Sequence, residues 1–458
     1  MLTHFKIENF KAWREADLTL GKVTGFFGSN SAGKSSLFQF LLALKQTRNA
    51  TDQGLLLDFG GPTAMVNLGT FKDVVHQQDE QTSIRWVLDW TLPRELVIRA
   101  RTPSKRRDQR FKRRGQRFKG KHLQTRCEVV GSNGLLRRHE LVYRFDEVDF
   151  KLQSKDGSEK DFELWADTEK FEFIRTPGRA PRSSRPIKAY RFPNEMWDYY
   201  QNADFLGDFE LCYEKLMDSI YYLGPLREYP WREYHWGGSR PEDVGPRGER
   251  TMDAILAATR DGKMRSLGYR KKKRTFQEMI AYWLKKLGLI DDFSLEEIAA
   301  GTNLYQAKVK TSRSSVPTAL TDVGFGVSQI LPILVLLYYV PKGSTVLLEQ
   351  PEIHLHPRVQ SELADVMLNI ADVRNVQIIL ESHSEHLMRR LQRRVAEEEA
   401  SSDDVKLYFV SSQQGQAQVE DLRLNDWGEI ENWPDQFFGD EMGEIFAITE
   451  ASLRRRTE

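Results

Sequence analysis

The residues best suited to chemistry lie near the start of the chain, where Gly28 to Ser35 read GSNSAGKS and match the pattern GxxxxGK[ST]. The glycines of this pattern let the backbone approach an anion, and N–H groups at the start of the following helix face it. Lys34 would neutralise the β and γ phosphates of a nucleotide, and the Ser35 hydroxyl would be a ligand of Mg²⁺. The pattern therefore predicts a site for ATP and Mg²⁺. Its residues are Gly28, Ser29, Asn30, Ser31, Ala32, Gly33, Lys34, Ser35 and Ser36.

Two elements must position this loop. Residues 22–27 are apolar enough for a buried strand, and residues 34–48 have apolar positions at helical spacing. A strand that passes through a glycine-rich turn into a helix is the context in which the pattern binds phosphate. A chance match is the alternative, and the flanking elements argue against it.

A candidate partner for the loop lies in the second half of the chain. Residues 345–349 read TVLLE, a buried strand that ends in a carboxylate, which is where a phosphate-loop ATPase holds its magnesium. Glu349 is therefore predicted, with Ser35, to hold the metal. Taken alone, this segment is also compatible with an ordinary strand that ends in an acid.

The residues after Glu349 favour the magnesium-binding interpretation over an ordinary strand. The run EQPEIHLHP, residues 349–357, resembles the Walker B and D-loop region of the OLD-type and SMC-like ABC ATPases. Residues 378–384, IILESHS, are similar to their switch region, and His383 takes the place of the histidine that senses the γ phosphate. Residues 322–329, DVGFGVSQ, are similar to a divergent signature loop that opens a helix. The resemblance adds to the predicted nucleotide contacts Gly324, Gly326 and Ser328.

This resemblance implies a fold and an assembly. The fold is α/β, an ABC-type P-loop ATPase head with a mixed sheet, here with a strand-rich basic insertion and a helical lobe. In ABC proteins the signature loop of one subunit closes on the nucleotide held by the other. The resemblance therefore implies a homodimer with ATP between its subunits, from which higher oligomers could be built. Similar segments at residues 222–227, 244–249 and 433–438 extend the likeness to about residues 1–95 and 215–445.

The group expected to activate water is unusual. In the commoner pattern an acid follows the magnesium carboxylate, whereas this chain has Gln350 there. A glutamine can orient water but cannot accept its proton, and Glu352, two residues further on, could serve instead. We therefore expect slow hydrolysis and an ATP-dependent switch rather than a motor. The predicted catalytic residues are Glu349, Gln350, Glu352 and His383.

Three histidines also allow a metal-site interpretation. His354 and His356 are two residues apart, and His383 is expected nearby in the fold. In the family that this segment resembles, however, the HLHP turn is structural and lies near the dimer contact. For His383, a core histidine with a hydrogen-bonded ring is the remaining alternative.

The resemblance also implies a biological role. Relatives of this type occur as ATPase subunits of antiphage defence systems, including the Septu and PARIS kinds, and in DNA repair. OLD nucleases carry a nuclease domain after the ATPase, whereas about 75 residues follow His383 here, so we expect the effector, such as a nuclease, to be a separate protein. The resemblance favours an ATP-dependent sensor and scaffold subunit of a defence complex. The alternative is an SMC- or RecF-like ATPase that binds DNA in repair or maintenance.

The totals for the chain are those of a globular protein of several units. It has 458 residues, a net charge of +1 and a hydrophobic content of 40%. Cys127 and Cys212 lie far apart, which favours neither a disulfide framework nor a zinc site. The longest apolar run, residues 330–340, is too short to span a bilayer, and the first residues look like a strand rather than a secretory signal. We expect a cytoplasmic protein without a membrane partner.

The pattern of elements divides the chain into five segments. Residues 1–80 are expected to form the N-terminal part of the ATPase head, residues 81–203 a strand-rich basic insertion, and residues 204–300 a helical lobe. Residues 301–415 would complete the head, and residues 416–458 would form a C-terminal tail.

The insertion carries a strongly basic segment. Residues 101–126 contain 12 lysines or arginines and one acid, Asp108. Phe111 and Phe118 interleave with these charges, a composition suited to neutralising phosphates with some stacking. The ligand would be DNA, RNA or an acidic protein that resembles DNA in charge, and a solvated loop is the alternative. The predicted polyanion-binding residues are Arg106, Arg107, Arg110, Lys112, Arg113, Arg114, Arg117 and Lys119.

Overall fold

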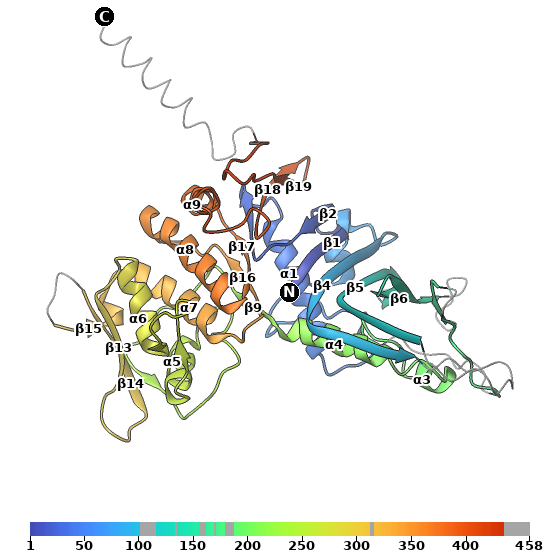
Figure 1. The fold of residues 1–458 in the computed structure, drawn as a ribbon, viewed down its shortest axis with the longest axis horizontal. Helices are drawn as coiled ribbons and strands as arrows, with labels where there is room; N and C mark the ends of the chain where they lie inside the picture. Colours follow the sequence, from blue (N-terminus) through green and yellow to red (C-terminus); the bar gives the residue numbers. More distant parts are fainter. Residues whose placement is uncertain are drawn as a thin grey trace, which may run out of the picture.

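The structure is a computed structural model, and it describes residues 1–100, 116–132, 135–154, 162–168, 171–178, 187–311 and 316–434. Its main feature in these ranges is a sheet of 13 strands in the order β8-β7-β6-β5-β4-β1-β2-β19-β18-β3-β17-β16-β9. Helices lie against this sheet, and a lobe lies beyond its β9 end (Figure 1). The α/β class and the mixed sheet are therefore confirmed.

Four parallel strands form the part of the sheet that carries the phosphate loop. They are β3 (Val23–Gly28), β17 (Gln377–Glu381), β16 (Thr345–Glu349) and β9 (Ile220–Leu223), and β18 (Val405–Gln413) runs parallel on the other side of β3. β16 and β17 are buried along their whole length, as continuous apolar runs predict for a parallel sheet covered on both faces. The carboxyl ends of β3, β16 and β17 meet at one edge of the sheet, where open α/β sheets bind ligands.

Helices cover both faces of these strands. Those on one face are α1 (Lys34–Asn49) and α4 (Leu206–Asp218), and those on the other are α7 (Phe325–Tyr339), α8 (Pro357–Arg374) and α9 (Glu385–Ala396). Alternate side chains of β16 enter the two cores, Leu347 on the α1 face and Val346 and Leu348 on the α7 face. This three-layer arrangement holds the carboxyl edge of the sheet in place.

The rest of the main sheet is largely antiparallel. Its strands are β1 (Leu2–Phe10), β2 (Trp13–Thr19), β4 (Ser83–Ala100), β5 (Gln116–Ser132), β6 (Leu135–Phe145), β7 (Val148–Ser154), β8 (Phe162–Ala166) and β19 (Gln416–Leu422). Because β1 pairs with both β2 and β4, the strands of the predicted insertion continue the sheet of the head. Ile84, Trp86, Leu88 and Trp90, which alternate in the sequence, are all buried. β19 places the first residues of the predicted tail in the main sheet, beside β18.

The lobe beyond β9 combines helices with small sheets. α5 (Thr251–Arg260) and α6 (Phe276–Lys286) pack against α7, and α6 begins at a capping box formed by Thr275 and Glu278. The other elements here are β10 (Tyr234–His235), β11 (Met264–Arg265), β12 (Arg274–Thr275), β13 (Asp292–Glu297), β14 (Leu304–Lys310), β15 (Thr318–Ala319) and the 3-10 helix η2 (Leu320–Asp322). The predicted helical lobe therefore also contains strands. The remaining short helices are α2 (Phe71–Val74), η1 (His76–Gln78) and α3 (Glu195–Tyr199).

One buried amide fixes the start of β17. Gln377, which is 1% exposed, accepts hydrogen bonds from the backbone N–H of Leu2 and the hydroxyl of Thr345, and it donates to the carbonyls of Leu2 and Gly21. Both donors and both lone pairs of the amide are therefore used. A buried amide with partners of this kind selects one arrangement of its neighbours, because each unpaired group would cost about 1–3 kcal/mol. β1, β16 and β17 are thus held together at the edge opposite the phosphate loop.

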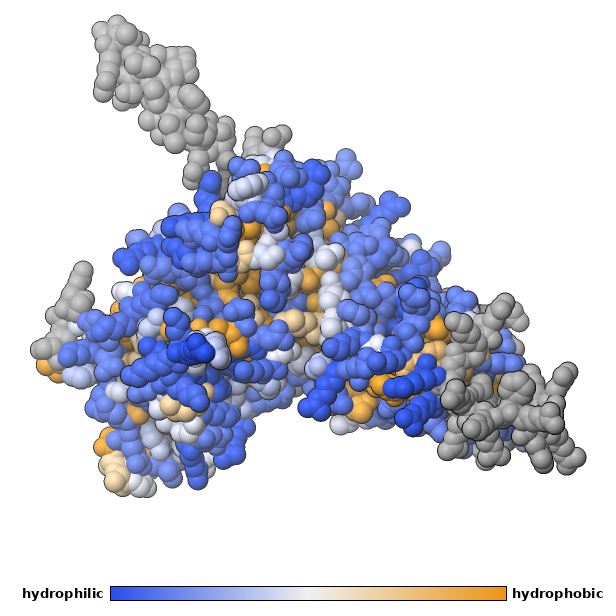
Figure 2. Space-filling model, viewed as in Figure 1, coloured by the Kyte–Doolittle hydropathy of each residue, from blue (hydrophilic) through white to orange (hydrophobic). Residues whose placement is uncertain are grey.

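The surface drawn in Figure 2 is mainly hydrophilic, with smaller hydrophobic groups between the charged side chains. This distribution agrees with a charged content of 29%. None of the helices in the described part of the chain combines the length and the apolar character that a bilayer crossing requires.

Candidate functional site

The turn between β3 and α1 depends on two glycines. Gly28 has φ of 135°, and a Cβ atom there would lie 1.9 Å from the carbonyl oxygen of Val410. Gly33, the residue before α1, has φ of 101°. Side chains are disfavoured at both positions, at the first by a backbone clash as well. Because no side chain caps the start of α1, its first N–H groups are available to an anion.

Lys34 lies folded across this turn. Its ammonium group donates to the carbonyls of Gly28 and Ser29, at 3.1 and 2.7 Å. Burial lowers the pKa of Lys34, and the carboxylates of Glu381 and Glu352 oppose this shift. The side chain is therefore a desolvated cation close to the loop, where a phosphate could replace the two carbonyls as its partner.

A tryptophan from β2 supports the turn from behind. The indole N–H of Trp13 lies 3.0 Å from the carbonyl of Gly33 and 2.9 Å from the hydroxyl of Ser36. The Ser36 hydroxyl in turn donates to the same Gly33 carbonyl. Ser36 is thus used in the structure of the turn rather than facing a ligand.

Two carboxylates lie side by side at the carboxyl edge of the sheet. Glu349 at the end of β16 is in register with Glu381 at the end of β17. The Ser35 hydroxyl donates to Glu381 at 2.7 Å, and the Tyr222 hydroxyl donates to Glu349 at 3.0 Å. Burial, and then the charge of Glu381, raise the pKa of Glu349 to about 7, and burial also raises the pKa of Glu381. Two desolvated carboxylates without a cation are unfavourable, so the arrangement favours a bound cation.

These groups suit magnesium. Mg²⁺ prefers oxygen ligands and usually takes one or two carboxylates, with phosphate oxygens and waters in its other positions. Ser35, Glu349 and Glu381 supply oxygen ligands of this kind. Such a site does not need three protein carboxylates, which agrees with the finding that the described residues contain no group of three or more His, Cys, Asp or Glu placed to hold a metal.

Glu381 is the site residue that the sequence analysis missed. In the sequence it directly follows the apolar run IIL and belongs to the segment that resembles a switch region. A usable signal was present, because the two apolar strands TVLLE and QIILE both end in glutamate. Only the parallel register shows that the two acids are neighbours.

The metal-site interpretation of the three histidines finds no support in the described residues. The His356 ring accepts a hydrogen bond from the backbone N–H of Arg358 and so caps the start of α8. The ring of His354 packs edge-on against Phe325, with 5.1 Å between ring centroids. Both side chains have structural partners, as the interpretation of the HLHP turn as structural implies.

The backbone turns sharply after Glu349. Gln350 has φ of 43°, in the left-handed region that side chains disfavour, and its N–H donates to the carbonyl of Glu381 at 2.8 Å. The buried guanidinium of Arg227 contacts the carbonyls of Glu349 and Gln350, at 3.2 and 3.5 Å. Burial lowers the pKa of Arg227 to about 10. Arg227 is therefore a positioning residue that holds the turn from the side of β9.

Glu352 and His383 are linked through the backbone. The N–H of His383 donates to the Glu352 carboxylate at 2.6 Å, and burial raises the pKa of Glu352. Burial, and then the nearby charge of Lys34, lower the pKa of His383, so its ring is neutral near pH 7. A hydrogen bond between the ring and the backbone of Gly28 ties β17 to the phosphate loop. His383 is thus placed beside the loop, as the sequence predicts for a residue that contacts the nucleotide.

One cavity brings several predicted site residues together. Its volume is about 520 Å³, and Asn30, Gln350, Glu352 and His383 all line it. The other lining residues are Ile353, His354, Gln360 and Ser384. The cavity therefore joins the phosphate loop to the turn after β16 and to the switch segment.

The predicted signature residues do not line this cavity. Gly324 is the exposed residue before α7, and Gly326 lies in its first turn. Ser328 is buried, and its hydroxyl donates to the Phe325 carbonyl at 2.7 Å. The start of α7 approaches the cavity through the Phe325 ring, which packs against the lining residue His354.

Most of the predicted polyanion-binding residues lie outside the described residues. They are Arg106, Arg107, Arg110, Lys112, Arg113 and Arg114. Arg117 and Lys119 are exposed on β5. The Lys119 ammonium group lies 3.1 Å from the carboxylate of Glu95. Lys119 thus already has an acidic partner, although an exposed pair of this kind is weak.

Comparison with protein families gives two matches. Residues 262–388 match the AAA ATPase domain family, and residues 401–448 match a family described as DUF3696, a protein of unknown function. The first match contains the predicted signature loop, Glu349 and His383 but not the phosphate loop. It supports an ATPase interpretation of the second half of the site. No curated protein is found to match the chain.

Three solved structures that resemble the chain are heads of SMC proteins. The first, an SMC head bound to the C-winged helix domain of ScpA, has 14% identity and a TM-score of 0.43 and covers 93% of this chain and 98% of that one. The SMC head domain from Thermotoga maritima has 10% identity and a TM-score of 0.41, with 92% and 98% covered. A Pyrococcus furiosus SMC head with an extended coiled coil, bound to the C-terminal domain of ScpA, has 10% identity and a TM-score of 0.42, with 92% and 96% covered. Since all three scores are below 0.5, these likenesses support no conclusion about function.

The carboxylate pair predicts a pH-dependent stability in the absence of magnesium. Because the pKa of Glu349 is about 7 in the folded chain and about 4.5 when it is unfolded, the folded state holds the extra proton between these values. Stability should therefore fall as pH rises through this window, by up to about 3 kcal/mol above pH 7. Glu349→Gln removes the charge, so with EDTA at pH 8 it should unfold at a higher temperature than the parent chain.

The difference should shrink as the pH approaches 5, and Mg²⁺ should raise the melting temperature of the parent chain but not that of Glu349→Gln. Thermal unfolding followed by circular dichroism measures both effects. Glu431→Gln, at an exposed carboxylate, is the control. A Glu349→Gln variant that is less stable than the parent chain at pH 8 would contradict the inferred charge repulsion.

Proposed function

We propose that this protein is an ABC-type ATPase that acts as an ATP-dependent switch. The observation that carries the proposal is the meeting of the phosphate loop with two in-register carboxylates at the carboxyl edge of the sheet. Phosphate-loop ATPases need a cradle of N–H groups, a lysine, a hydroxyl and an acid for Mg²⁺. Here the groups are the Gly28 to Gly33 turn, Lys34, Ser35 and the pair Glu349 and Glu381.

Each group has a distinct role in this proposal. The N–H groups at the start of α1 bind the phosphates, and Lys34 exchanges its two carbonyl partners for phosphate oxygens. Ser35, Glu349 and Glu381 would hold Mg²⁺, which would neutralise charge on the β and γ phosphates. His383, beside the loop, would donate its ring N–H to a γ-phosphate oxygen in place of the Gly28 backbone.

The two candidates for activating water differ in placement. Gln350 lines the cavity beside the loop, directly after the end of β16. Glu352 also lines the cavity, and its raised pKa makes it a better proton acceptor near neutral pH than an ordinary carboxylate. We propose that Gln350 orients the water and that Glu352 accepts its proton. Such a divided arrangement supports slow hydrolysis, and therefore a switch.

A second copy of the chain would complete the site. Gly324 and the exposed ring of Phe325 open α7 next to the cavity, where the Phe325 ring packs against His354, but neither residue lines the cavity. A signature loop that is exposed and does not line the cavity of its own chain is suited to contact the nucleotide of another. We propose an ATP-dependent homodimer in which Gly324, Gly326 and Ser328 form this contact.

The proposed biological setting rests on the resemblance of the motifs. It is a subunit of an antiphage defence complex that senses an invader and controls a separate effector. The SMC- or RecF-like alternative, a DNA-binding ATPase of repair or maintenance, is equally compatible with the site. The exposed Arg117 and the basic residues before it would serve a polyanion in either setting.

Lys34→Ala should weaken the binding of ATP with Mg²⁺ by on the order of 100-fold, because it removes charge-assisted hydrogen bonds to the phosphates. Isothermal titration calorimetry with ATP and Mg²⁺ measures the change. Lys22→Ala is the matched control, since Lys22 precedes the same strand and pairs instead with Asp404. Unchanged affinity in Lys34→Ala would refute the nucleotide site.

Gln350→Glu should raise the rate of ATP hydrolysis by about 10-fold or more, because it places a general base beside the magnesium carboxylate. Phosphate release at saturating ATP and Mg²⁺ measures the rate. Glu352→Gln should lower it, which tests the proposed proton acceptor separately. The idea that Gln350 limits turnover fails if Gln350→Glu hydrolyses ATP at the parent rate.

The two biological settings differ in what accompanies the protein. A defence subunit should co-purify from its own host with a nuclease-like effector encoded beside it. A maintenance ATPase should instead purify without such a partner and hydrolyse ATP several-fold faster when duplex DNA is added at low salt. Tandem affinity purification with mass spectrometry, followed by ATPase assays with and without DNA, distinguishes them.

A further inference from the structure

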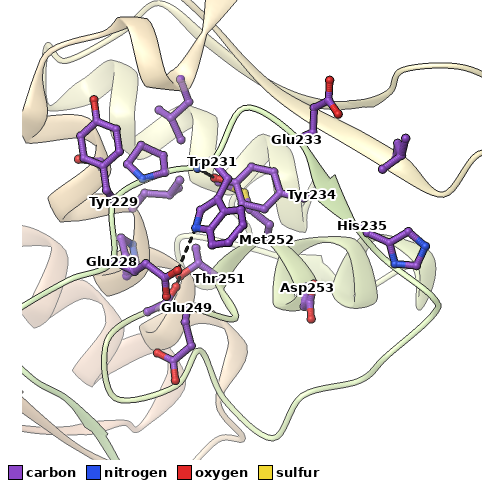
Figure 3. Close-up of a pocket in the computed structure, with 17 residues that line it drawn as sticks. Glu228, Tyr229, Trp231, Glu233, Tyr234, His235, Glu249, Thr251, Met252 and Asp253 are labelled. Atoms are coloured by element: carbon purple, nitrogen blue, oxygen red, sulfur yellow. Dashed lines mark hydrogen bonds between the residues drawn. The ribbon is translucent and has the colours of Figure 1, made fainter.

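A second cavity lies away from the nucleotide site and has no role in the proposed ATPase reaction. Its volume is about 440 Å³, within the range of ligand pockets. It is formed by the segment 228–235 before and within β10, by the start of α5, and by Ser328, Leu331 and Pro332 of α7 (Figure 3). The cavity is therefore bounded on one side by the helix that the signature loop opens.

The lining of this cavity is acidic. Four acidic residues line it, Glu228, Glu233, Glu249 and Asp253, and Figure 3 shows the Glu228 carboxylate directed toward Trp231. Among the described lining residues there is no lysine or arginine, and none of the four acids forms an ion pair with a described residue. Glu228 accepts its hydrogen bond from an indole N–H, Glu249 from a backbone N–H and Asp253 from the Ser239 hydroxyl, all of which are neutral donors. The negative charge is thus left for a ligand.

The lining is also aromatic. Trp231 is 63% exposed and Tyr229 is 55% exposed, which is unusual for side chains of this size. The indole N–H of Trp231 donates to Glu228 at 2.9 Å, and the backbone N–H of Trp231 donates to the Tyr234 hydroxyl at 2.8 Å. Figure 3 shows the indole held by these bonds in the middle of the cavity, with Tyr234 next to it. Its ring face is thereby fixed in orientation and open to a partner.

These two properties select a cation and exclude an anion such as a phosphate. Aromatic faces attract cations, and adjacent carboxylates add charge-assisted hydrogen bonds. An arginine guanidinium suits the site best, because it is planar, stacks on indole and phenol rings and presents five N–H donors to acids around its rim. A lysine ammonium group could pair with the acids but could not stack on the flat faces of the aromatic rings.

The surroundings indicate where this guanidinium comes from. Leu226, 74% exposed, and Tyr229, 55% exposed, lie on the segment that lines the cavity or immediately before it. A free small molecule would leave this apolar surface uncovered, whereas a polypeptide would cover it with the residues beside its arginine. We infer that the cavity binds an arginine side chain, flanked by apolar residues, on a partner protein.

The segment that lines the cavity also contacts the signature loop. Tyr229 donates to the carbonyl of Thr321 at 3.3 Å, and Arg232 lies 2.7 Å from Asp322. At its other end the same segment carries Arg227, which contacts the carbonyls of Glu349 and Gln350. A partner seated in the cavity therefore contacts a segment that reaches both halves of the proposed composite site. This consequence rests on the proposed function, whereas the binding itself does not.

Isothermal titration calorimetry without nucleotide tests the binding. The probe is a pentapeptide, acetylated and amidated at its ends, with one arginine between two leucines. We expect a Kd on the order of 100 μM, and binding at least about 10-fold weaker when citrulline, which has the same shape without the charge, replaces arginine. Trp231→Ala and Glu228→Gln should each weaken binding by about 5-fold or more. Trp427→Ala, at another highly exposed tryptophan, should leave binding unchanged.

Several results would overturn the inference. They are equal binding of the citrulline peptide, unchanged binding by Trp231→Ala, and no binding at about 2 mM peptide. If free arginine amide binds as tightly as the peptide, the ligand is a small cation rather than a protein. If the parent chain does not bind the peptide and Trp231→Ala loses ATP-dependent dimerisation, the surface is a contact between copies of this chain. Each of these two results also overturns the inference. Lys34→Ala should bind the peptide normally, so failure here is distinct from failure of the ATP site.

Discussion

Parallel pairing between β16 and β17 sets Glu349 beside Glu381, so two buried carboxylates repel each other at the end of the strands. The rest of the site is arranged around this pair. Each carboxylate has one neutral hydroxyl donor, Tyr222 for the first and Ser35 for the second, and Lys34 is the cation on the loop side. Because the pair is buried, the repulsion is weakly screened. Without a cation beside the two carboxylates this arrangement is electrostatically unfavourable, so part of the free energy of cation binding would go into relieving their repulsion.

The segment from Gly224 to His235 connects features that are far apart in the sequence. It leaves the end of β9, contacts the turn after β16 through Arg227, and reaches the signature loop through Tyr229 and Arg232. A movement of the turn after β16 would therefore be transmitted through this segment to the start of α7. Coupling between sites requires a physical connection of this kind, in which two regions share one element.

Contiguous motifs were predictable, and contacts between distant segments were not. The loop from Gly28 to Ser35 was found because its chemistry and spacing lie in eight successive residues. Glu349 followed from the apolar strand that ends at it, and His383 followed from the resemblance of IILESHS to a switch region; the structure places Glu349 at the end of β16 and His383 two residues after the end of β17. The α/β class was implied by the same resemblance.

The features that the sequence did not predict depend on strand pairing and on contacts between segments that are far apart in the sequence. Glu381 becomes a neighbour of Glu349 only through strand register, and Arg227 finds its carbonyl partners across a neighbouring strand. The sequence did predict antiparallel strands after residue 80 but not that β4 would pair with β1. The acidic and aromatic cavity draws on the segment 228–235 and on α5, α7, β14 and η2, and its acidic and aromatic residues belong to no recognised motif.

Continuity of the main sheet has a mechanical meaning. From β8 to β9 every strand is hydrogen-bonded to the next, with no linker between the strand-rich region and the phosphate loop (Figure 1). A hinge needs a few residues that can change φ and ψ freely, and a ladder of backbone hydrogen bonds opposes such a change. The ladder is shortest between β2 and β19, which pair only at Trp13 and Ala417, so a movement of the strand-rich region relative to β3 would be concentrated at this joint.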